Sequence, residues 1–261
     1  MLQVVSQWGR DTMKMVTSPA RGKEDGVSRA RATIVALVSM VTGAGVLALM
    51  AFGLASAAPH QSALVAQSLG TTSVTVDGKT VTMPHVALRI ATYPDSLAGV
   101  HGAGGGAHPD WVSYSNDNLV VPAHAEVTMT IDQYDSGGTL NNPFFANVWG
   151  TIGGTASMDG HDVTKVDPTA VGHTFTLRGI PGNGTPLFVS VPLPEDFNST
   201  TPVTIGEGAY PAPVVVKFSF LTGSKGVYNW NCEFPCGGSR IGQFGQAMST
   251  FGYMSGTLTV K

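Results

Sequence analysis

The two cysteines of this 261-residue chain stand close together near its C-terminal end. Cys232 and Cys236 lie within the run YNWNCEFPCGGSRIGQFGQAMSTFGYMSGTLTV, which extends from Tyr228 to Val260. Two thiolates at this spacing can hold a soft metal ion such as copper. They can also form a disulfide, because a separation of four residues in a turn allows the short Cα approach that the bond requires. Both chemistries stay open until the surrounding elements are considered.

An apolar segment without charged residues precedes these positions. It extends from Thr33 to Ala58, and the 22 residues from Thr33 to Leu54 exceed the length needed to span a bilayer, about 20 residues. The apolar region of a secretory signal is shorter, about 7 to 15 residues. This difference favours a retained transmembrane helix that comprises residues 33–57. Cleavage after Ala57 is the alternative, because small residues precede that position.

The charges that flank the apolar segment predict its orientation. Residues 1–32 hold six of the 14 lysines and arginines but three of the 17 acidic residues, so they carry a net charge of +3 and the remainder carries −6. The positive-inside rule keeps this basic arm in the cytoplasm. We therefore expect a single-pass protein of the cell membrane with an acidic extracytoplasmic domain, which would steer a cationic redox protein.

Beyond the membrane segment, short strands alternate with turns rich in glycine and proline. Asp77-Gly78 predicts a hairpin between Thr71–Val76 and Lys79–Met83, and His85–Thr92 reads as a further strand. A glycine-rich loop follows at residues 99–108. Residues 58–110 are thus expected to lead, as a hairpin and linker, into a domain that occupies residues 111–261.

The predicted domain contains several further strands. The patterns place them at Glu126–Ile131, Thr174–Leu177, Leu187–Val191, Val214–Leu221 and Gly256–Val260. About seven strands at this spacing predict an all-β fold of the Greek-key β-sandwich type. A long irregular insertion at residues 132–172 separates two of them, and loops of that length usually contact a partner or carry function.

From about Trp111 to Lys261 the chain resembles a cupredoxin. The resemblance rests on the HTF pattern at His173, on the aromatic strand that runs into Cys232, and on Met254 at the start of the closing strand. The stretch NLVVPAHAEVTMTI at residues 118–131 is also similar to the strand pair that begins many cupredoxin domains. The resemblance implies copper as cofactor, with His173 and Cys232 as ligands and Met254 as a weak axial ligand.

The run CEFPCG at residues 232–237 is similar to the C-x-x-x-C-G of the binuclear copper site in cytochrome c oxidase subunit II. One helix followed by an external cupredoxin is also the layout of one-helix subunit II proteins. In that family a histidine and a methionine follow the second cysteine, whereas Arg240 and Gln243 stand at those positions here. If Cys236 replaces the missing imidazole, the donors form a soft set that favours Cu(I): His173, Cys232, Cys236 and Met254.

Three functions follow from these features. The first is a membrane-anchored component of a respiratory electron-transfer complex, similar to terminal oxidase subunit II, acting as a subunit of an oxidoreductase and not as a catalyst alone. The second is a copper-free structural subunit held by a Cys232–Cys236 disulfide. The third is a secreted mononuclear copper protein. In the first two, the helix at 33–57 and the insertion at 132–172 would contact a larger membrane-protein partner.

Other functions lack support in the sequence. There is no Walker loop, no G-x-S-x-G and no H-E-x-x-H motif, and the basic residues are not concentrated outside the short arm. Phosphoryl transfer, serine hydrolysis, zinc proteolysis and nucleic-acid binding are therefore not indicated.

Overall fold

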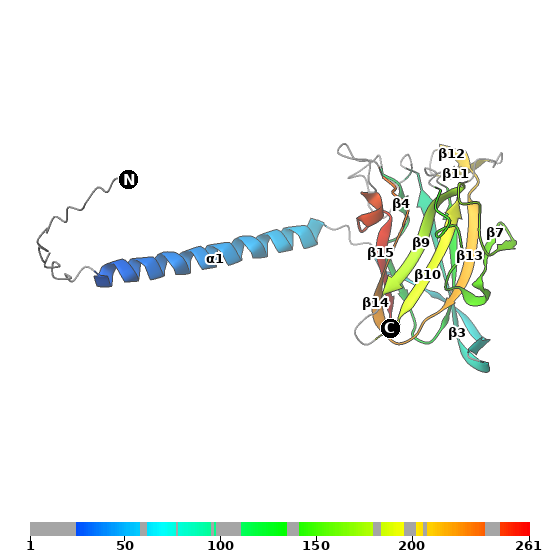
Figure 1. Ribbon diagram of the computed structural model, residues 1–261, viewed down its shortest axis with the longest axis horizontal. Helices are drawn as coiled ribbons and strands as arrows, with labels where there is room; N and C mark the ends of the chain where they lie inside the picture. Colours follow the sequence, from blue (N-terminus) through cyan, green and yellow to red (C-terminus); the bar gives the residue numbers. More distant parts are fainter. Residues whose placement is uncertain are drawn as a thin grey trace, which may run out of the picture. The chain divides into compact units, whose positions relative to one another are not determined.

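The structure is a computed structural model that describes residues 25–57, 62–76, 78–94, 97, 111–134, 141–179, 184–195, 202–205, 208–237 and 246–261. Its contacts form two compact units, Met1–Ser56 and Ala57–Lys261. The first contains one helix and the second is built from strands (Figure 1). The predicted glycine-rich loop at 99–108 and the positions of Arg240 and Gln243 lie outside the described residues.

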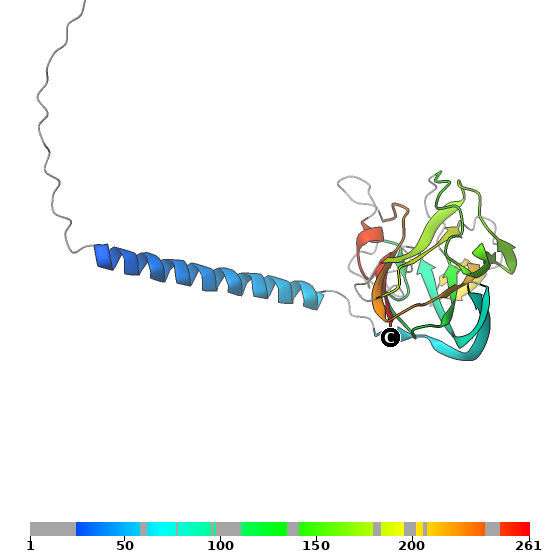
Figure 2. The same ribbon diagram turned by 60° about the horizontal axis from the view of Figure 1, so that its bottom comes forward.

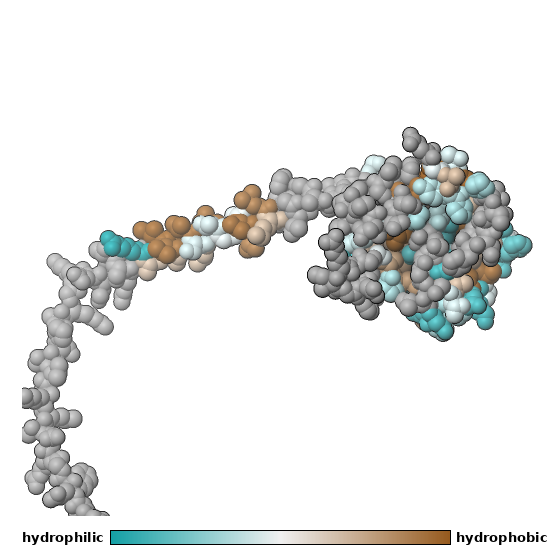
Figure 3. Space-filling view, turned by 90° about the horizontal axis from the view of Figure 1, so that it is seen from above, coloured by the Kyte–Doolittle hydropathy of each residue, from teal (hydrophilic) through white to brown (hydrophobic). Residues whose placement is uncertain are grey.

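Helix α1, Asp25–Ala57, includes the predicted apolar segment. Its 20 residues from Arg31 to Met50 are long and apolar enough to cross a membrane, since 20 helical residues span about 30 Å. Apolar side chains are exposed along this part of the helix, and the brown surface in Figure 3 shows them on one face. Such a helix near the N-terminus fits a membrane anchor or a signal sequence.

The second unit is an all-β sandwich of two main sheets, which confirms the predicted fold class (Figures 1 and 2). The six-stranded sheet has the order β1 (Leu64–Val65), β5 (Asn118–Val121), β15 (Ser255–Val260), β14 (Gly226–Asn231), β9 (Val171–Gly179), β10 (Leu187–Pro194). The seven-stranded sheet has the order β2 (Gln67–Val76), β3 (Lys79–Tyr93), β6 (Glu126–Gln133), β13 (Val214–Leu221), β7 (Ala156–Met158), β8 (His161–Val163), with β4 (Ser113–Tyr114) beside β3.

A hairpin and two short 3-10 helices are the remaining elements in the described part of the unit. Strands β11 (Pro202–Ile205) and β12 (Gly208–Pro211) form a separate hairpin. Two short 3-10 helices follow β6 and β14, respectively: η2 (Ile152–Gly154) and η3 (Ala247–Ser249). Strands predicted at 126–131, 174–177, 187–191, 214–221 and 256–260 are all present, within β6, β9, β10, β13 and β15.

The core lies between the two main sheets and follows from side-chain alternation. In β13, for example, Val214, Val216, Phe218 and Phe220 are buried while Lys217 is exposed. Alternate residues of a strand point to opposite faces, so this pattern directs one face of the sheet inward. The first seven residues of β9 are buried on both faces, which gives the site below a rigid support.

The predicted hairpin is present as β2 and β3, with Gly78 in the left-handed region at φ 74°. Strand β3 continues through Pro84 to Tyr93, so the strand expected at 85–92 is part of it. Proline is tolerated here because the pairing of β3 with β6 begins only at His85, so Pro84 has a partner strand on one side only. Strand β3 also pairs in parallel with β6, and Val86, Leu88 and Ile90 enter the core, so the sandwich extends to residues before 111.

The insertion at 132–172 contains more regular structure than its composition indicates. Strands β7 and β8 form a small hairpin, and β7 pairs with β13 at Val216↔Met158 and Lys217↔Ser157. The insertion therefore extends the seven-stranded sheet at one edge.

Candidate metal centre

Strand pairing brings the predicted ligands to the same end of the six-stranded sheet. Strand β9 begins at Val171, and the antiparallel strand β14 ends beside it, with Asn231 opposite Thr176. Strand β15 in turn begins opposite the end of β14, with Ser255 opposite Asn231. His173 near the start of β9, Cys232 just after β14 and Met254 just before β15 must therefore lie close together.

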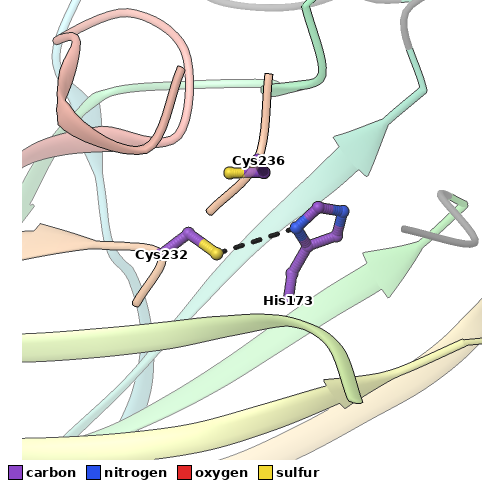
Figure 4. A group of neighbouring side chains, drawn as sticks. All are labelled: His173, Cys232 and Cys236. Carbon is purple, nitrogen blue, oxygen red and sulfur yellow. Dashed lines mark hydrogen bonds between the residues drawn. The ribbon is translucent and has the colours of Figure 1, made fainter. Parts of the chain in front are cut away.

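The side chains of His173, Cys232 and Cys236 converge in a cluster, which we call the sulfur cluster (Figure 4). Their ligand atoms lie within 4.8 Å of one another, and all three residues are buried. The Cys232 sulfur is 3.6 Å from Nδ1 of His173. Both cysteines are thiols in the structure, with no disulfide between them.

Met254 joins this neighbourhood through its backbone. Its carbonyl accepts a hydrogen bond of 2.8 Å from the N–H of Cys232, and its side chain is fully buried. The N–H of Met254 donates to the carbonyl of Ala247 in η3 at 3.0 Å. The thioether is therefore attached to a backbone position that is fixed directly beside Cys232.

The loop between the two cysteines is held by several hydrogen bonds. The Cys232 sulfur lies 3.4 Å from the carbonyl oxygen of Phe234, and it accepts a hydrogen bond of 3.4 Å from the N–H of Phe234. The N–H of Glu233 donates to the Thr174 hydroxyl at 2.8 Å, and its carboxylate forms an ion pair with Arg178 at 2.9 Å. These contacts tie the loop to β9, the strand that carries His173.

A glycine fixes the exit from this loop. Gly237 has a φ of 78°, and a Cβ at this position would lie 2.4 Å from the Cβ of Ala247. Only glycine accommodates both the left-handed backbone and the close approach. The chain consequently leaves Cys236 in contact with η3, the element that also holds Met254.

The electrostatic environment favours a thiolate at Cys232. Burial raises the pKa of its thiol, but hydrogen bonds with Cys236 and His173 and the charge of His173 lower it by more. The pKa therefore lies well below the ordinary value of 9.0. The thiolate is the form of cysteine that binds a metal ion. The lowered pKa therefore favours the form of Cys232 that can act as a ligand.

Two buried aromatic side chains adjoin the cluster. Tyr114 is fully buried and donates a hydrogen bond of 3.0 Å to the carbonyl of Thr174. Burial first, and then the two neighbouring cysteines, raise its pKa well above 10.0. Its ring packs edge-on against Trp230 at 4.9 Å. Both rings belong to the same buried core as the two cysteines.

A second histidine has a different set of neighbours. Nε2 of His85 lies 2.8 Å from the Thr128 hydroxyl and 3.9 Å from the carboxylate of Glu126, and the Thr128 hydroxyl is 2.8 Å from that of Ser219. We call these four residues the oxygen cluster. Among the described residues, only the sulfur cluster brings three histidine, cysteine or acidic ligand atoms this close together.

The donor atoms of the sulfur cluster fit copper. An imidazole nitrogen and two thiolate sulfurs, with a thioether nearby, form a soft set, and copper in its reduced state prefers such ligands. The cluster is buried and is held by hydrogen bonds to β9, so its donors need little rearrangement to bind. Sequence reasoning identified these residues, but it did not identify Tyr114 or the Arg178–Glu233 ion pair, whose partners are distant in the chain.

The β-sandwich can be compared with known proteins. No protein-family model matches the chain, and no curated protein matches it. Among solved structures it is similar to rusticyanin from Thiobacillus ferrooxidans, a cupredoxin, with 14% identity over 68% of this chain and 77% of that chain and a TM-score of 0.29. A rusticyanin variant with a histidine replaced by methionine gives 16% identity, 68% and 82% coverage and a TM-score of 0.25. We therefore base the chemistry of the site on this chain's own side chains.

Proposed function

We propose that this chain is a membrane-anchored, extracytoplasmic copper protein that relays electrons within a respiratory complex, in the manner of terminal oxidase subunit II. One observation carries the proposal: the ligand atoms of His173, Cys232 and Cys236 lie within 4.8 Å of one another in a buried cluster. Copper bound there would supply one-electron redox chemistry. Met254 is the proposed fourth donor, because its backbone is hydrogen-bonded to that of Cys232.

The residues around the cluster support this function by holding the donors rigidly. The Arg178–Glu233 ion pair and the Thr174 hydroxyl fix the cysteine loop on β9. Buried strands and rings keep water away from the sulfur atoms. A site that changes little between two oxidation states transfers electrons with little reorganisation, and a packed sandwich provides such a support.

The proposed location rests on helix α1 and on the charges before it. The helix is long enough to span a bilayer, and the basic arm at residues 1–32 favours a cytoplasmic N-terminus. We propose that the helix at 33–57 packs against a larger membrane protein and that the insertion at 132–172 contacts it outside the membrane. Small residues in the helix, such as Gly43 and Gly45, suit close packing of two helices, and among the described residues no atom of another residue lies within 4 Å of a Cβ built at either position.

The experiment is copper analysis of the full-length chain in detergent, with visible and paramagnetic resonance spectra before and after reduction. We expect one copper ion per chain in the wild type and loss of that copper in Cys232→Ser. Met254→Leu should change the spectrum or the affinity, whereas Met248→Leu, a matched methionine that lies in the groove beside β14, should change neither. A reduced chain that takes up no copper would contradict the proposal.

A copper-free structural subunit is the second candidate. The observation that favours it is the proximity of the two cysteine sulfurs, which lie within 4.8 Å with three residues between them. Oxidation would then join Cys232 and Cys236 and remove both thiolates as ligands. Thiol titration of the isolated chain separates the two functions, because the structural subunit would show two thiols after reduction and none before it.

A further inference from the structure

Strand β2 forms one edge of the seven-stranded sheet, and among the described residues its only partner strand is β3. A bulge between Ser68 and Gly70 interrupts the pairing near the start of β2, but the residues from Thr71 to Val76 pair with β3 without a break. We call Thr71–Val76 the β2 edge. The N–H and C=O groups that point outward from such an edge are a template for another strand.

The same part of the hairpin extends past the rest of its sheet. Pairing of β3 with β6 begins at His85, so within the described part of the chain Lys79–Pro84 pairs with β2 alone. This two-stranded ribbon projects from the domain near the label β3 in Figure 1. None of its described residues is buried, and Val81 is 42% exposed. An isolated two-stranded ribbon is only marginally stable in water, so a further strand would stabilise it.

The two open sides of the ribbon differ in their protection against pairing. The β3 side carries Lys79 and Pro84, a charge and a residue without an N–H, and both discourage the addition of a strand. The β2 side has no charged residue and no proline from Gln67 to Val76. Of the two sides, the β2 edge is therefore the one that can accept a strand.

The side chains of the β2 edge make it complementary to itself. Thr72, Val74 and Val76 are half-buried, whereas Ser73 and Thr75 between them are exposed on the other face. In an antiparallel pair, residues directly opposite each other lie on the same face. If two copies pair about Val74, then Val74 meets its own copy, Thr72 meets Val76 of the second copy, and Ser73 meets Thr75 of the second copy. Branched side chains meet branched ones, hydroxyls meet hydroxyls, and no charges repel.

This register also extends an apolar row. Val74 lies opposite Val81 within the hairpin. Pairing about Val74 would place the two Val74 side chains between the two Val81 side chains, in one row across four strands. Adjacent β-branched side chains on one face of a sheet stabilise strand pairing.

The proposed membrane anchor favours a second copy as the partner. The β2 strand begins only a short distance along the chain from α1, at Gln67 after the helix ends at Ala57. Copies that α1 holds in one membrane share an orientation and a thin layer, which raises their effective concentration for each other.

We propose that the β2 edge is a self-association surface, at which two copies of this chain join their seven-stranded sheets through antiparallel β2 strands. The interface is isologous, because each copy contributes the same residues. The paired segment is short, so the dimer is reversible and its fraction rises with the concentration of the chain.

The test measures the dimer Kd of the full-length, metal-free chain in detergent by sedimentation equilibrium, so copper does not enter it. The variant Ser73→Lys/Thr75→Lys places a lysine opposite a lysine twice in the proposed dimer. Like charges directly opposite each other destabilise strand pairing, and we expect Kd to rise about tenfold. The increase should be smaller at high salt.

The variant Thr80→Lys/Thr82→Lys is the matched control. Thr80 and Thr82 lie opposite Thr75 and Ser73 in the hairpin, so the control adds the same charge to the same face. Both variants also remove the contact of 3.3 Å between the hydroxyls of Ser73 and Thr82. The control lysines lie on the protected side of the ribbon, and at physiological salt Kd should stay within about twofold of the wild type. Thermal unfolding would verify that each variant is folded.

A third variant tests the register. Ser73→Lys/Thr75→Glu places each lysine opposite a glutamate of the second copy, and opposite charges across a strand pair are favourable. This variant should dimerise at least as tightly as the wild type, although it carries the same lysine at position 73 as the first variant.

Four results would overturn the proposal. The first is a wild-type chain that stays monomeric at every concentration, both in detergent and in lipid nanodiscs. The second is an unchanged Kd in Ser73→Lys/Thr75→Lys, which would assign the dimer to another surface such as α1. The others are an equal loss in the matched control, or an equal loss in Ser73→Lys/Thr75→Glu. Failure of copper loading would reject the proposed function and leave these results unaffected.

Discussion

Two histidines of the sandwich lie in opposite chemical settings. His173 is buried beside two sulfur atoms, whereas His85 has 25% of its side chain exposed and is surrounded by hydroxyl and carboxylate oxygens. The imidazole of His85 on β3 and the hydroxyls of Thr128 on β6 and Ser219 on β13 are joined by hydrogen bonds. These groups therefore offer no set of soft ligand atoms to a metal ion. The difference shows that the neighbours of a histidine, and not the residue itself, determine whether it can join a set of soft metal ligands.

The strongest test of this contrast exchanges each imidazole for an amide. His173→Gln should weaken Cu(I) binding by at least about 100-fold, because loss of an outer partner alone costs up to that factor. His85→Gln should leave the affinity within about twofold of the wild type, since its partners are oxygens. Competition with a Cu(I)-specific chelator measures both. Equal losses in the two variants would show that copper does not bind at the sulfur cluster.

The second test uses Tyr114, the buried tyrosine whose pKa is affected by the two cysteines of the sulfur cluster. Burial raises the pKa of Tyr114 above its ordinary value of 10.0, so the folded state keeps the proton that the unfolded state loses. Its contribution to stability is therefore complete below pH 10.0 and decreases as the pH rises above it. Tyr114→Phe should cost about 1 kcal/mol at neutral pH, through the lost hydrogen bond to Thr174, and should reduce the loss of stability at alkaline pH.

Denaturant unfolding between pH 7 and pH 11 follows this effect. Tyr210→Phe, which removes a hydroxyl from the small β11–β12 hairpin, is the control. An unchanged alkaline slope in Tyr114→Phe would mean that other groups cause the loss of stability.

The smallest effect is expected in the oxygen cluster. Thr128→Val preserves shape but removes the hydroxyl that lies between His85 and Ser219. Both partners are partly accessible to water, so we expect a loss of about 0.5 to 1 kcal/mol in the free energy of unfolding and no change in copper affinity. Denaturant unfolding and the chelator competition provide the two readouts. A large loss of copper affinity in Thr128→Val would indicate that the metal binds near the oxygen cluster and not at the sulfur cluster.

The sequence predicted the parts of the molecule that depend on local pattern. Asp77-Gly78 predicted the β2–β3 turn, alternation predicted β6 and β13, and the spacing around Cys232 predicted the loop. The convergence of His173 and Cys232 followed from the resemblance to a known fold. That step required long-range strand pairing, which the local pattern alone does not contain.

Other features could not be predicted because they depend on contacts between distant residues. The sequence offered Phe144 and Trp149 only as members of an irregular insertion, and their stacking depends on the pairing of Trp149 with Ser190. The Arg178–Glu233 ion pair likewise joins β9 to the loop that follows β14, and tertiary packing sets the register of these two strands. The continuation of β3 through Pro84 depended on the point at which its pairing with β6 begins, which is one residue later.

The contacts at Gly237 have a consequence for protein engineering. The carbonyl of Gly237 accepts the N–H of Gln246 at 3.4 Å, and the carbonyl of Ala247 accepts the N–H of Met254 at 3.0 Å. These bonds join Gly237 and Gln246, which flank residues 238–245, to each other, and they join η3 to the residue before the closing strand. The segment should therefore be exchangeable, and a graft carrying one histidine would offer a second imidazole without rebuilding the sandwich.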